Sequence, residues 1–417
     1  MTHLNKPQAS RLHCLDWLRV IAIAVLVLYH IGMVYVPEWG YHFKNPLKGD
    51  LLQSFMLLTS PWRMGLLWLV SGMAFAHMCK GLDLLRLSTI RLAIKRSNQI
   101  LLPLLVGILF IVPIQLFAEM KQAGDMPLGF SDFVYAFYVQ PQQYFAEYAS
   151  GIWPRFDVNH LWFLRSLWGF SMVLIILSPV LNTQFIQASI TWLASRVVPL
   201  LLLFIAPIVA IELFFEGEAV REYYGFVLLL LGFCLGRQNG FWHTLTKHLK
   251  LLCLLSAIAM LALQIGFVVI WQGGLHQTNS ALNVLIECIY LANKILPLLA
   301  IFALAHRFLN TPNNTIKQLN PYVFPLYILH QSVIILVAYL ATTSSIEVIQ
   351  VPEFQIWMNL LLTPVICATL LFFIAKVNVL RVGFGMRFKN NLDPYKNMLT
   401  RSIVFIICLP MIIRLIT

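Results

Sequence analysis

Long apolar runs alternate with short polar connections along almost the whole chain. A run of about 20 apolar residues is the length at which an α-helix crosses a bilayer. Backbone groups in lipid must be satisfied within their own segment, so such runs form helices. The pattern predicts an all-α, polytopic transmembrane helical bundle of about ten or eleven spans. The candidate spans are 15–36, 58–78, 98–118, 160–181, 196–214, 222–237, 249–272, 283–308, 319–341, 355–379 and 400–417.

The polar connections alternate in charge. The second connection, 79–97, is basic and contains Lys80, Arg86, Arg91, Lys95 and Arg96. The third, 119–159, is acidic and contains Glu119, Asp125, Asp132, Glu147 and Asp157. Because cytoplasmic loops carry the excess of Lys and Arg, this alternation predicts a cytoplasmic N-terminus. Five cations break the pattern: Lys44, Lys48, Lys121, Arg155 and Arg221.

The composition is that of a protein solvated by lipid. Hydrophobic residues make up 59% of the chain and charged residues 11%, against about 25% charged in soluble domains. The net charge is +12, but most basic residues lie in alternate loops and form no nucleic-acid-binding motif. No nucleic-acid partner is therefore expected. The seven cysteines are scattered without metal-ligand spacing, and no metal is predicted. We expect one membrane-embedded domain, 1–417, in a bacterial inner membrane, without an appended soluble domain; a homo-oligomer is compatible with this class.

The long outer connection is rich in aromatic residues: Phe133, Tyr135, Phe137, Tyr138, Tyr144, Phe145, Tyr148 and Trp153. Two interpretations stay open. These rings form an interfacial belt, or they stack on sugar rings, since connections of this length are often functional.

Several ionisable residues fall inside predicted spans, where they are costly and usually mark function. Measured along each helix from its cytoplasmic end, five of them share a layer at roughly 21–24 Å; they are His30, Arg63, Arg165, Glu212 and Lys294. His330 comes out nearer the middle, at about 16 Å. The layer contains four possible cations and one carboxylate. It forms structural ion pairs, or it holds an anionic ligand or a developing oxyanion.

Arg19 and His30 lie on the first span, 11 residues apart. Eleven steps of about 100° return to within about 20° of the starting direction, so both side chains leave one helix face, about 16 Å apart. An imidazole suits the removal of a hydroxyl proton near neutral pH, although a lone His in a span is more often a packing residue.

Four segments, in order, resemble signatures of the acyltransferase-3 family of membrane proteins. They are Leu15–Arg19 with Asp16 and the following His30, Trp68–Met73 with Ser71, His160–Leu164 with Trp162, and Pro325–Gln331 with Tyr327 and His330. Within the family, the chain looks most like the branch that includes periplasmic-glucan succinyl-transfer proteins. The resemblance covers nearly the whole chain.

The resemblance implies transfer of an acyl group from cytoplasmic acyl-CoA, either acetyl-CoA or succinyl-CoA, to a glycan or other sugar-containing acceptor outside. The family's essential Arg and His correspond to Arg19 and His30. The basic stretch resembles a family region with two spaced arginines, but Gln99 stands where the second is expected.

A set of roles follows from this resemblance. His30 acts as general base or accepts the acyl group itself, and Arg19 positions the donor. Arg91, Lys95 and Arg96 meet the coenzyme A phosphates. The remaining candidates are expected to contact the acceptor, stabilise an oxyanion or line the passage between the two sides of the membrane. They are Asp16, Arg63, Ser71, His160, Trp162, Arg165, Lys294, Tyr327 and His330.

Two other classes of function remain. A proton-coupled transporter also buries ionisable residues, but it often contains paired half-repeats with interrupted helices, which the sequence does not show. A lipid or glycan flippase needs a cationic cavity but no base.

Overall fold

The computed structural model describes residues 12–45, 50–79, 87–139, 145, 148 and 158–387. These residues are almost entirely helical, and no strand occurs among them. They include eight helices long and apolar enough to cross a membrane, or nine if the bent pair Glu218–Leu235 and Asn239–Lys247 counts as one span. The expected all-α, polytopic membrane fold is confirmed. The predicted span 400–417 lies outside the described residues.

The chain forms two compact units. The first comprises Met1–Ala22, Pro61–Lys80 and Val180–Asn320, and the second comprises Ile23–Ser60, Gly81–Pro179 and Pro321–Thr417. Helix α1 (Cys14–Tyr35) is continuous and contributes to both.

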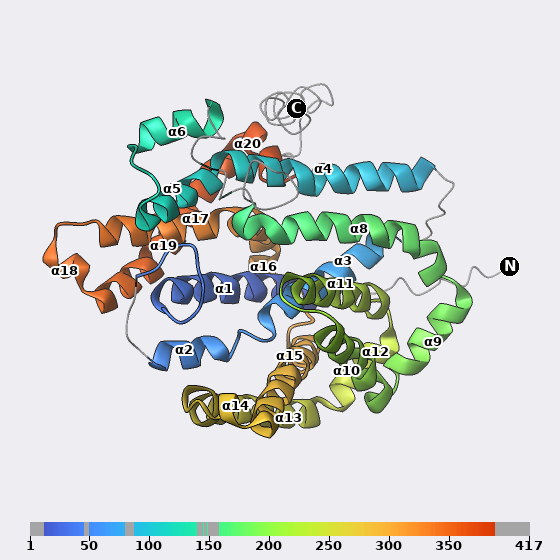
Figure 1. Ribbon diagram of the computed structural model, residues 1–417. Helices are drawn as coiled ribbons and strands as arrows, with labels where there is room; N and C mark the ends of the chain where they lie inside the picture. Colours follow the sequence, from blue (N-terminus) through green and yellow to red (C-terminus); the bar gives the residue numbers. More distant parts are fainter. Residues whose placement is uncertain are drawn as a thin grey trace. The chain divides into compact units, whose positions relative to one another are not determined.

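The first unit also holds two pairs of helices that pack side by side, α3 with α11 and α13 with α15. Its helices after α1 are α3 (Arg63–Met78), α9 (Gln184–Ala194), α10 (Val197–Phe214), α11 (Glu218–Leu235), α12 (Asn239–Lys247), α13 (Leu249–Gly266), the π-helix η3 (Phe267–Gln272), α14 (Leu275–Thr278), α15 (Ser280–Phe308) and α16 (Asn314–Leu319). Figure 1 shows α3 against α11 near the centre of the view.

Glycines allow α3 and α11 to pack closely. A Cβ atom on Gly72 would lie 2.0 Å from the carbonyl oxygen of Leu229, and one on Gly232 would lie 2.2 Å from that of Leu69. Small residues let membrane helices approach until their backbones touch. The Ser-Gly segment of the second predicted span therefore has a packing role at Gly72.

The second unit is organised around α17. Its elements after α1 are α2 (Asp50–Leu57), α4 (Leu87–Phe110), α5 (Val112–Ala123), α6 (Phe130–Val139), η2 (Asn159–Leu161), α8 (Trp162–Leu181), α17 (Val323–Thr342), α18 (Glu347–Gln350), α19 (Pro352–Lys376) and α20 (Asn378–Gly383). The short turn η4 (Asn320–Tyr322) leads from the first unit into α17. Helix α17 packs on α19 and α5, as Figure 1 shows in orange and teal. Most of α17 is buried.

The predicted connection 79–97 is wrong in its second half, because α4 already begins at Leu87. Arg91, Lys95 and Arg96 therefore lie on a helix. Arg and Lys are good helix formers, whereas a search for apolar runs detects only the later part of such a helix. The helix ends at Phe110, and Pro113 stands in the first turn of α5, a position that proline favours.

Three aromatic residues of the long outer connection are core residues, and they neither form an interfacial belt nor stack on sugars. Phe133 is 0% exposed, and Phe137 and Phe145 are 4% exposed. Their rings pack on one another, with centroids between 5.6 and 6.1 Å apart. Tyr135, by contrast, is exposed, so its ring is accessible for stacking. Tyr144 and Trp153 lie outside the described residues.

Candidate active site

The second unit brings two histidines into contact. His30, near the end of α1, and His330, on α17, are 300 residues apart, and the Nδ1 atom of His30 lies 2.8 Å from the Nε2 atom of His330. The rings stack with centroids 5.0 Å apart. His330 is 0% exposed, whereas His30 is only partly buried. His330 is thus a direct partner of His30, not only a residue lining a passage.

The contacts of His330 determine which ring nitrogen of His30 carries the hydrogen. The Nδ1 atom of His330 lies 2.6 Å from the Tyr327 carbonyl oxygen. A carbonyl only accepts, so this nitrogen carries the hydrogen. In the neutral ring, which full burial favours, Nε2 of His330 then accepts a hydrogen from Nδ1 of His30. We infer that Nε2 of His30 keeps its lone pair and can act as a base or a nucleophile.

His160 is a buried organising residue. It is 5% exposed, and its Nε2 atom donates to the carbonyl oxygen of Ile328 at 2.9 Å. Its Nδ1 atom lies 3.4 Å from the amide nitrogen of Gln115. The hydroxyl of Tyr327 donates to the backbone carbonyl of His160. Its ring therefore points inwards onto α17, and a role of His160 in supporting the acceptor stays a prediction.

Asn159 connects this region to the outer loop. Its Oδ1 atom accepts from the His160 backbone N–H at 2.8 Å and from the Gln331 side chain at 2.9 Å. Its φ of 44° is in the left-handed region, which Asn tolerates better than most residues. The side-chain amide then points its nitrogen at His42, 3.3 Å from Nδ1.

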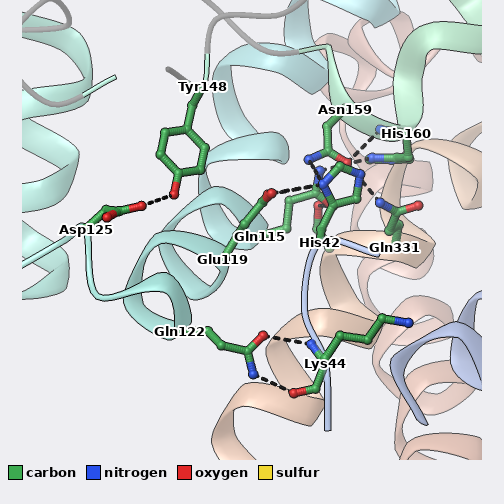
Figure 2. Close-up of polar contacts among 11 residues, drawn as sticks. His42, Lys44, Gln115, Glu119, Gln122, Asp125, Tyr148, Asn159, His160 and Gln331 are labelled. Atoms are coloured by element: carbon green, nitrogen blue, oxygen red, sulfur yellow. Dashed lines mark hydrogen bonds and ion pairs between the residues drawn. The ribbon is translucent and has the colours of Figure 1, made fainter. Parts of the chain in front are cut away.

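His42 contacts the carboxylate of Glu119, which Figure 2 shows beside Asn159. The Nδ1 atom of His42 lies 3.2 Å from each carboxylate oxygen of Glu119. Tyr41 contacts both histidines, with ring centroids 5.9 Å from His30 and 5.6 Å from His42. Burial raises the pKa of Tyr41 well above its usual value, so its hydroxyl stays neutral.

Lys44 holds the loop that carries Tyr41 and His42. Its Nζ atom donates to the carbonyl oxygens of Met33 and Val36 at 2.8 and 2.6 Å. These carbonyls lie at the C-terminal end of α1, where a cation is favoured. Burial lowers the pKa of Lys44 to about 8, although Glu38 acts in the opposite direction. Gln122 of α5 binds both the N–H and the carbonyl of Lys44 (Figure 2).

In the first unit, Arg19 and Asp16 interact across one turn of α1. An Nη atom of Arg19 lies 3.3 Å from the Asp16 carboxylate, which also accepts from Asn320. Asp16 lines a pocket of about 140 Å³, and the other lining residues are His13, Trp17, Thr311, Pro312, Asn313, Asn314, Ile316 and Lys317. Ligand pockets usually measure about 300–1,000 Å³, so this one suits a small polar group rather than a nucleotide.

Lys294 and Glu212 form an ion pair in the first unit. The Lys294 ammonium also lies over the rings of Tyr224 and Tyr290, 5.2 and 5.4 Å from their centroids. Lys294 is therefore the cation of the predicted layer that pairs with its single carboxylate, as the ion-pair interpretation expects. Arg63 begins α3 in the same unit.

The remaining candidates are distributed over three helices. Arg91 and Lys95 are exposed on α4, whereas Arg96 binds the hydroxyl of Ser171 on α8 at 3.2 Å. Trp162 and Arg165 lie half-buried in the first turn of α8. Ser71 is half-buried on α3 of the first unit.

Sequence reasoning missed five polar residues of the second unit that contact the histidines or one another: Tyr41, His42, Gln115, Asn159 and Gln331. Glu119 was noted only for its charge. The one available signal was their position, since His42 and Glu119 each follow an outer end of a predicted span.

The fold and these contacts define an integral membrane protein with a partly accessible histidine backed by a buried one. The acyltransferase-3 family model, described as an acyltransferase domain, matches residues 12–376. The chain belongs to this family and is an acyltransferase. No curated protein and no solved structure matches the chain.

Proposed function

We propose that the protein moves an acyl group from acyl-CoA on the cytoplasmic side to a glycan hydroxyl on the outer side of a bacterial inner membrane. The observation that carries this proposal is the His30–His330 hydrogen bond of 2.8 Å, together with membership of the acyltransferase family. The bond orients the imidazole of His30, and an oriented imidazole suits acyl transfer as a base or a nucleophile.

The donor side is proposed to lie along α4. Arg91 and Lys95 are exposed there, and cations suit the phosphates of coenzyme A. Arg96 is engaged with Ser171, so we give it a positioning role. Arg19, on the same helix as His30 and about 16 Å nearer the N-terminus, would guide the donor towards His30.

The acyl group is proposed to be acetyl or succinyl. Resemblance to the glucan-modifying branch favours succinyl, while acetyl is the more common donor in the family. Mass spectrometry of surface glycans from cells with and without the protein would distinguish them, because the two esters add different masses.

The test supplies purified protein with radiolabelled acetyl-CoA or succinyl-CoA and an envelope glycan extract. We expect label in the glycan with one donor, and a loss of about 100-fold or more in His30→Ala, since a general base contributes about 10²–10⁴. Well-folded His30→Ala with full activity would exclude His30 from the reaction.

A flippase is the competing function for a cationic, membrane-embedded chain. It predicts glycan movement in vesicles with no label transfer from either donor. The imidazole of His30, oriented by His330, favours the transferase, because moving a glycan needs no base.

A further inference from the structure

The pocket that Asp16 lines lies between two distant segments of the first unit, the start of α1 and the segment 310–317. Two hydrogen bonds join these segments. The backbone N–H of Cys14 donates to the side-chain oxygen of Asn310 at 3.3 Å, and the side-chain amide of Asn320 donates to the Asp16 carboxylate. The pocket is therefore held in shape from both sides.

The side chains around this pocket offer mainly hydrogen-bond donors. The ammonium group of Lys317 and the indole N–H of Trp17 can only donate, and within the described part of the chain neither side chain bonds to another protein group. The side-chain oxygen of Asn313 accepts from the Ile316 N–H at 3.0 Å, which leaves its NH₂ group for a ligand. A set of donors without matching acceptors suits an oxyanion.

The charge of the pocket favours the same kind of ligand. Among the lining residues that the structure describes, Asp16 is the one carboxylate, and Arg19 compensates it at 3.3 Å. Lys317 is then an excess positive charge beside the pocket. Ammonium and N–H groups bind phosphate oxygens through charge-assisted hydrogen bonds, so a phosphate group fits these residues better than a cation does.

Both segments are predicted to face the cytoplasm. The chain before α1 contains Lys6 and Arg11, and the connection between α15 and α17 contains Lys317; basic connections lie on that side. The proposed donor, acyl-CoA, arrives there and carries a terminal 3′-phosphate. Because the pocket of about 140 Å³ is smaller than the usual ligand site of about 300–1,000 Å³, it can hold a terminal group but not a whole coenzyme.

We propose that this pocket binds the 3′-phosphate of the acyl-CoA donor, with Lys317 and the Trp17 indole donating to its oxygens. The inference rests on the proposed acyltransferase function. Coenzyme A also carries a diphosphate within its chain, so the pocket and the exposed cations of α4 are not competing sites. Arg19, to which the family resemblance gives a role in positioning the donor, pairs with Asp16 of this pocket.

Binding of coenzyme A and of 3′-dephospho-coenzyme A to the purified protein tests this site without catalysis. By isothermal titration calorimetry, the wild type should bind coenzyme A about 10-fold or more tightly than the dephospho compound, because hydrogen bonds between charged groups are strong. Lys317→Gln should weaken coenzyme A binding about 10-fold and change dephospho-coenzyme A binding less than about twofold, as a double-mutant cycle requires of a direct contact.

Two further variants make the test specific. Trp17→Phe keeps a ring and removes the N–H, so it should weaken coenzyme A binding by about 3- to 10-fold, the effect of one hydrogen bond, and leave dephospho-coenzyme A unchanged. Lys247→Gln is the matched control. Lys247 is exposed in the first unit and is predicted to lie on the same side of the membrane, but it does not line the pocket. Both Kd values should stay those of the wild type.

Equal Kd values for the two compounds in the wild type would overturn the proposal. So would a preference for coenzyme A that persists in Lys317→Gln, or one that Lys247→Gln also abolishes. Inorganic phosphate is the third probe: if it raises the Tm of the wild type but not of Lys317→Gln while both compounds bind equally, the pocket binds free phosphate and not the donor.

The proposed function fails separately from the site. Coenzyme A binding with the expected preference, but without acyl transfer to any glycan, would remove the acyltransferase reaction proposed above and leave the phosphate pocket standing. Acyl transfer with no preference for the 3′-phosphate would do the reverse. A wild type that binds no coenzyme A would remove both.

Discussion

At the scale of single residues, the tautomer of His30 is determined through His330 by a hydrogen bond to the carbonyl of Tyr327. The Tyr327 carbonyl holds the hydrogen of His330 on Nδ1, and His330 in turn holds that of His30. Outer partners of this kind determine tautomer and ring orientation. The tautomer of the partly buried imidazole of His30 thus depends on the fully buried imidazole of His330.

We expect His330→Leu to lower kcat for transfer by about 10- to 100-fold, the usual cost of losing such a partner. The KM for the donor should change little, since His330 is buried and does not meet the donor. His330→Gln, whose amide oxygen can still accept from His30, should retain more activity than His330→Leu. Steady-state kinetics with labelled donor would measure this, and equal activity of His330→Leu and wild type would contradict it.

At the scale of helices, backbone contact between α3 and α11 depends on glycine. The lack of a Cβ atom at Gly72 leaves room for the Leu229 carbonyl, and Gly232 leaves room for that of Leu69. The obstructing atoms belong to the backbone, so a substituted residue cannot be accommodated by a rotamer change.

Gly72→Ala should therefore destabilise the protein by about 1–3 kcal/mol, the range for overpacking. Thermal unfolding in detergent, followed by intrinsic fluorescence, should show a lower Tm. Gly169→Ala on α8 is the control, because nothing lies within 4 Å of its added Cβ atom. The Tm of the control should be unchanged or higher. A Gly72→Ala variant with the same Tm as the Gly169→Ala variant would contradict the packing role of Gly72.

At the scale of the whole molecule, the excess of Lys and Arg in alternate loops predicts a cytoplasmic N-terminus. Three of the five cations that break this alternation have partners within the protein. Lys44 binds carbonyls at the end of α1, Lys121 lies over the ring of Phe117 at 5.6 Å, and Arg221 pairs with Glu218. These cations have partners in the protein, so they are weaker signals of sidedness than free loop charges.

Cysteine labelling in spheroplasts tests the predicted cytoplasmic N-terminus. Lys247 and Gln277 are exposed at the two ends of the α13–η3 segment. In a background without the native cysteines, Gln277→Cys should react with a membrane-impermeant maleimide in intact spheroplasts. Lys247→Cys should react only after permeabilisation. The opposite pattern would place the N-terminus outside.

The helices could be predicted well from the sequence alone. The span 15–36 is observed as Cys14–Tyr35, and 249–272 is observed as α13 continued by η3. A helix that crosses lipid requires a continuous apolar run, and such a run can be seen directly in the sequence. A polar helix end has no such run, which is why the start of α4 at Leu87 was missed.

The site was only partly predictable. His30 and His330 could each be selected, because ionisable groups are costly within spans, but depth along the helices separated them by about 6 Å. Helices tilt and begin at different levels, so a common depth axis does not decide which side chains meet. The depth estimate did place Lys294 and Glu212 in one layer, and these two side chains pair.

By itself, the sequence determined that this is a helical membrane protein, and it singled out His30 through its cost in an apolar span. Only the tertiary structure decided the partners, His330 for His30 and Glu119 for His42, across separations of 300 and 77 residues. The physical reason is that hydrophobic periodicity specifies which face of a helix is buried, whereas hydrogen bonds depend on which neighbour that face meets.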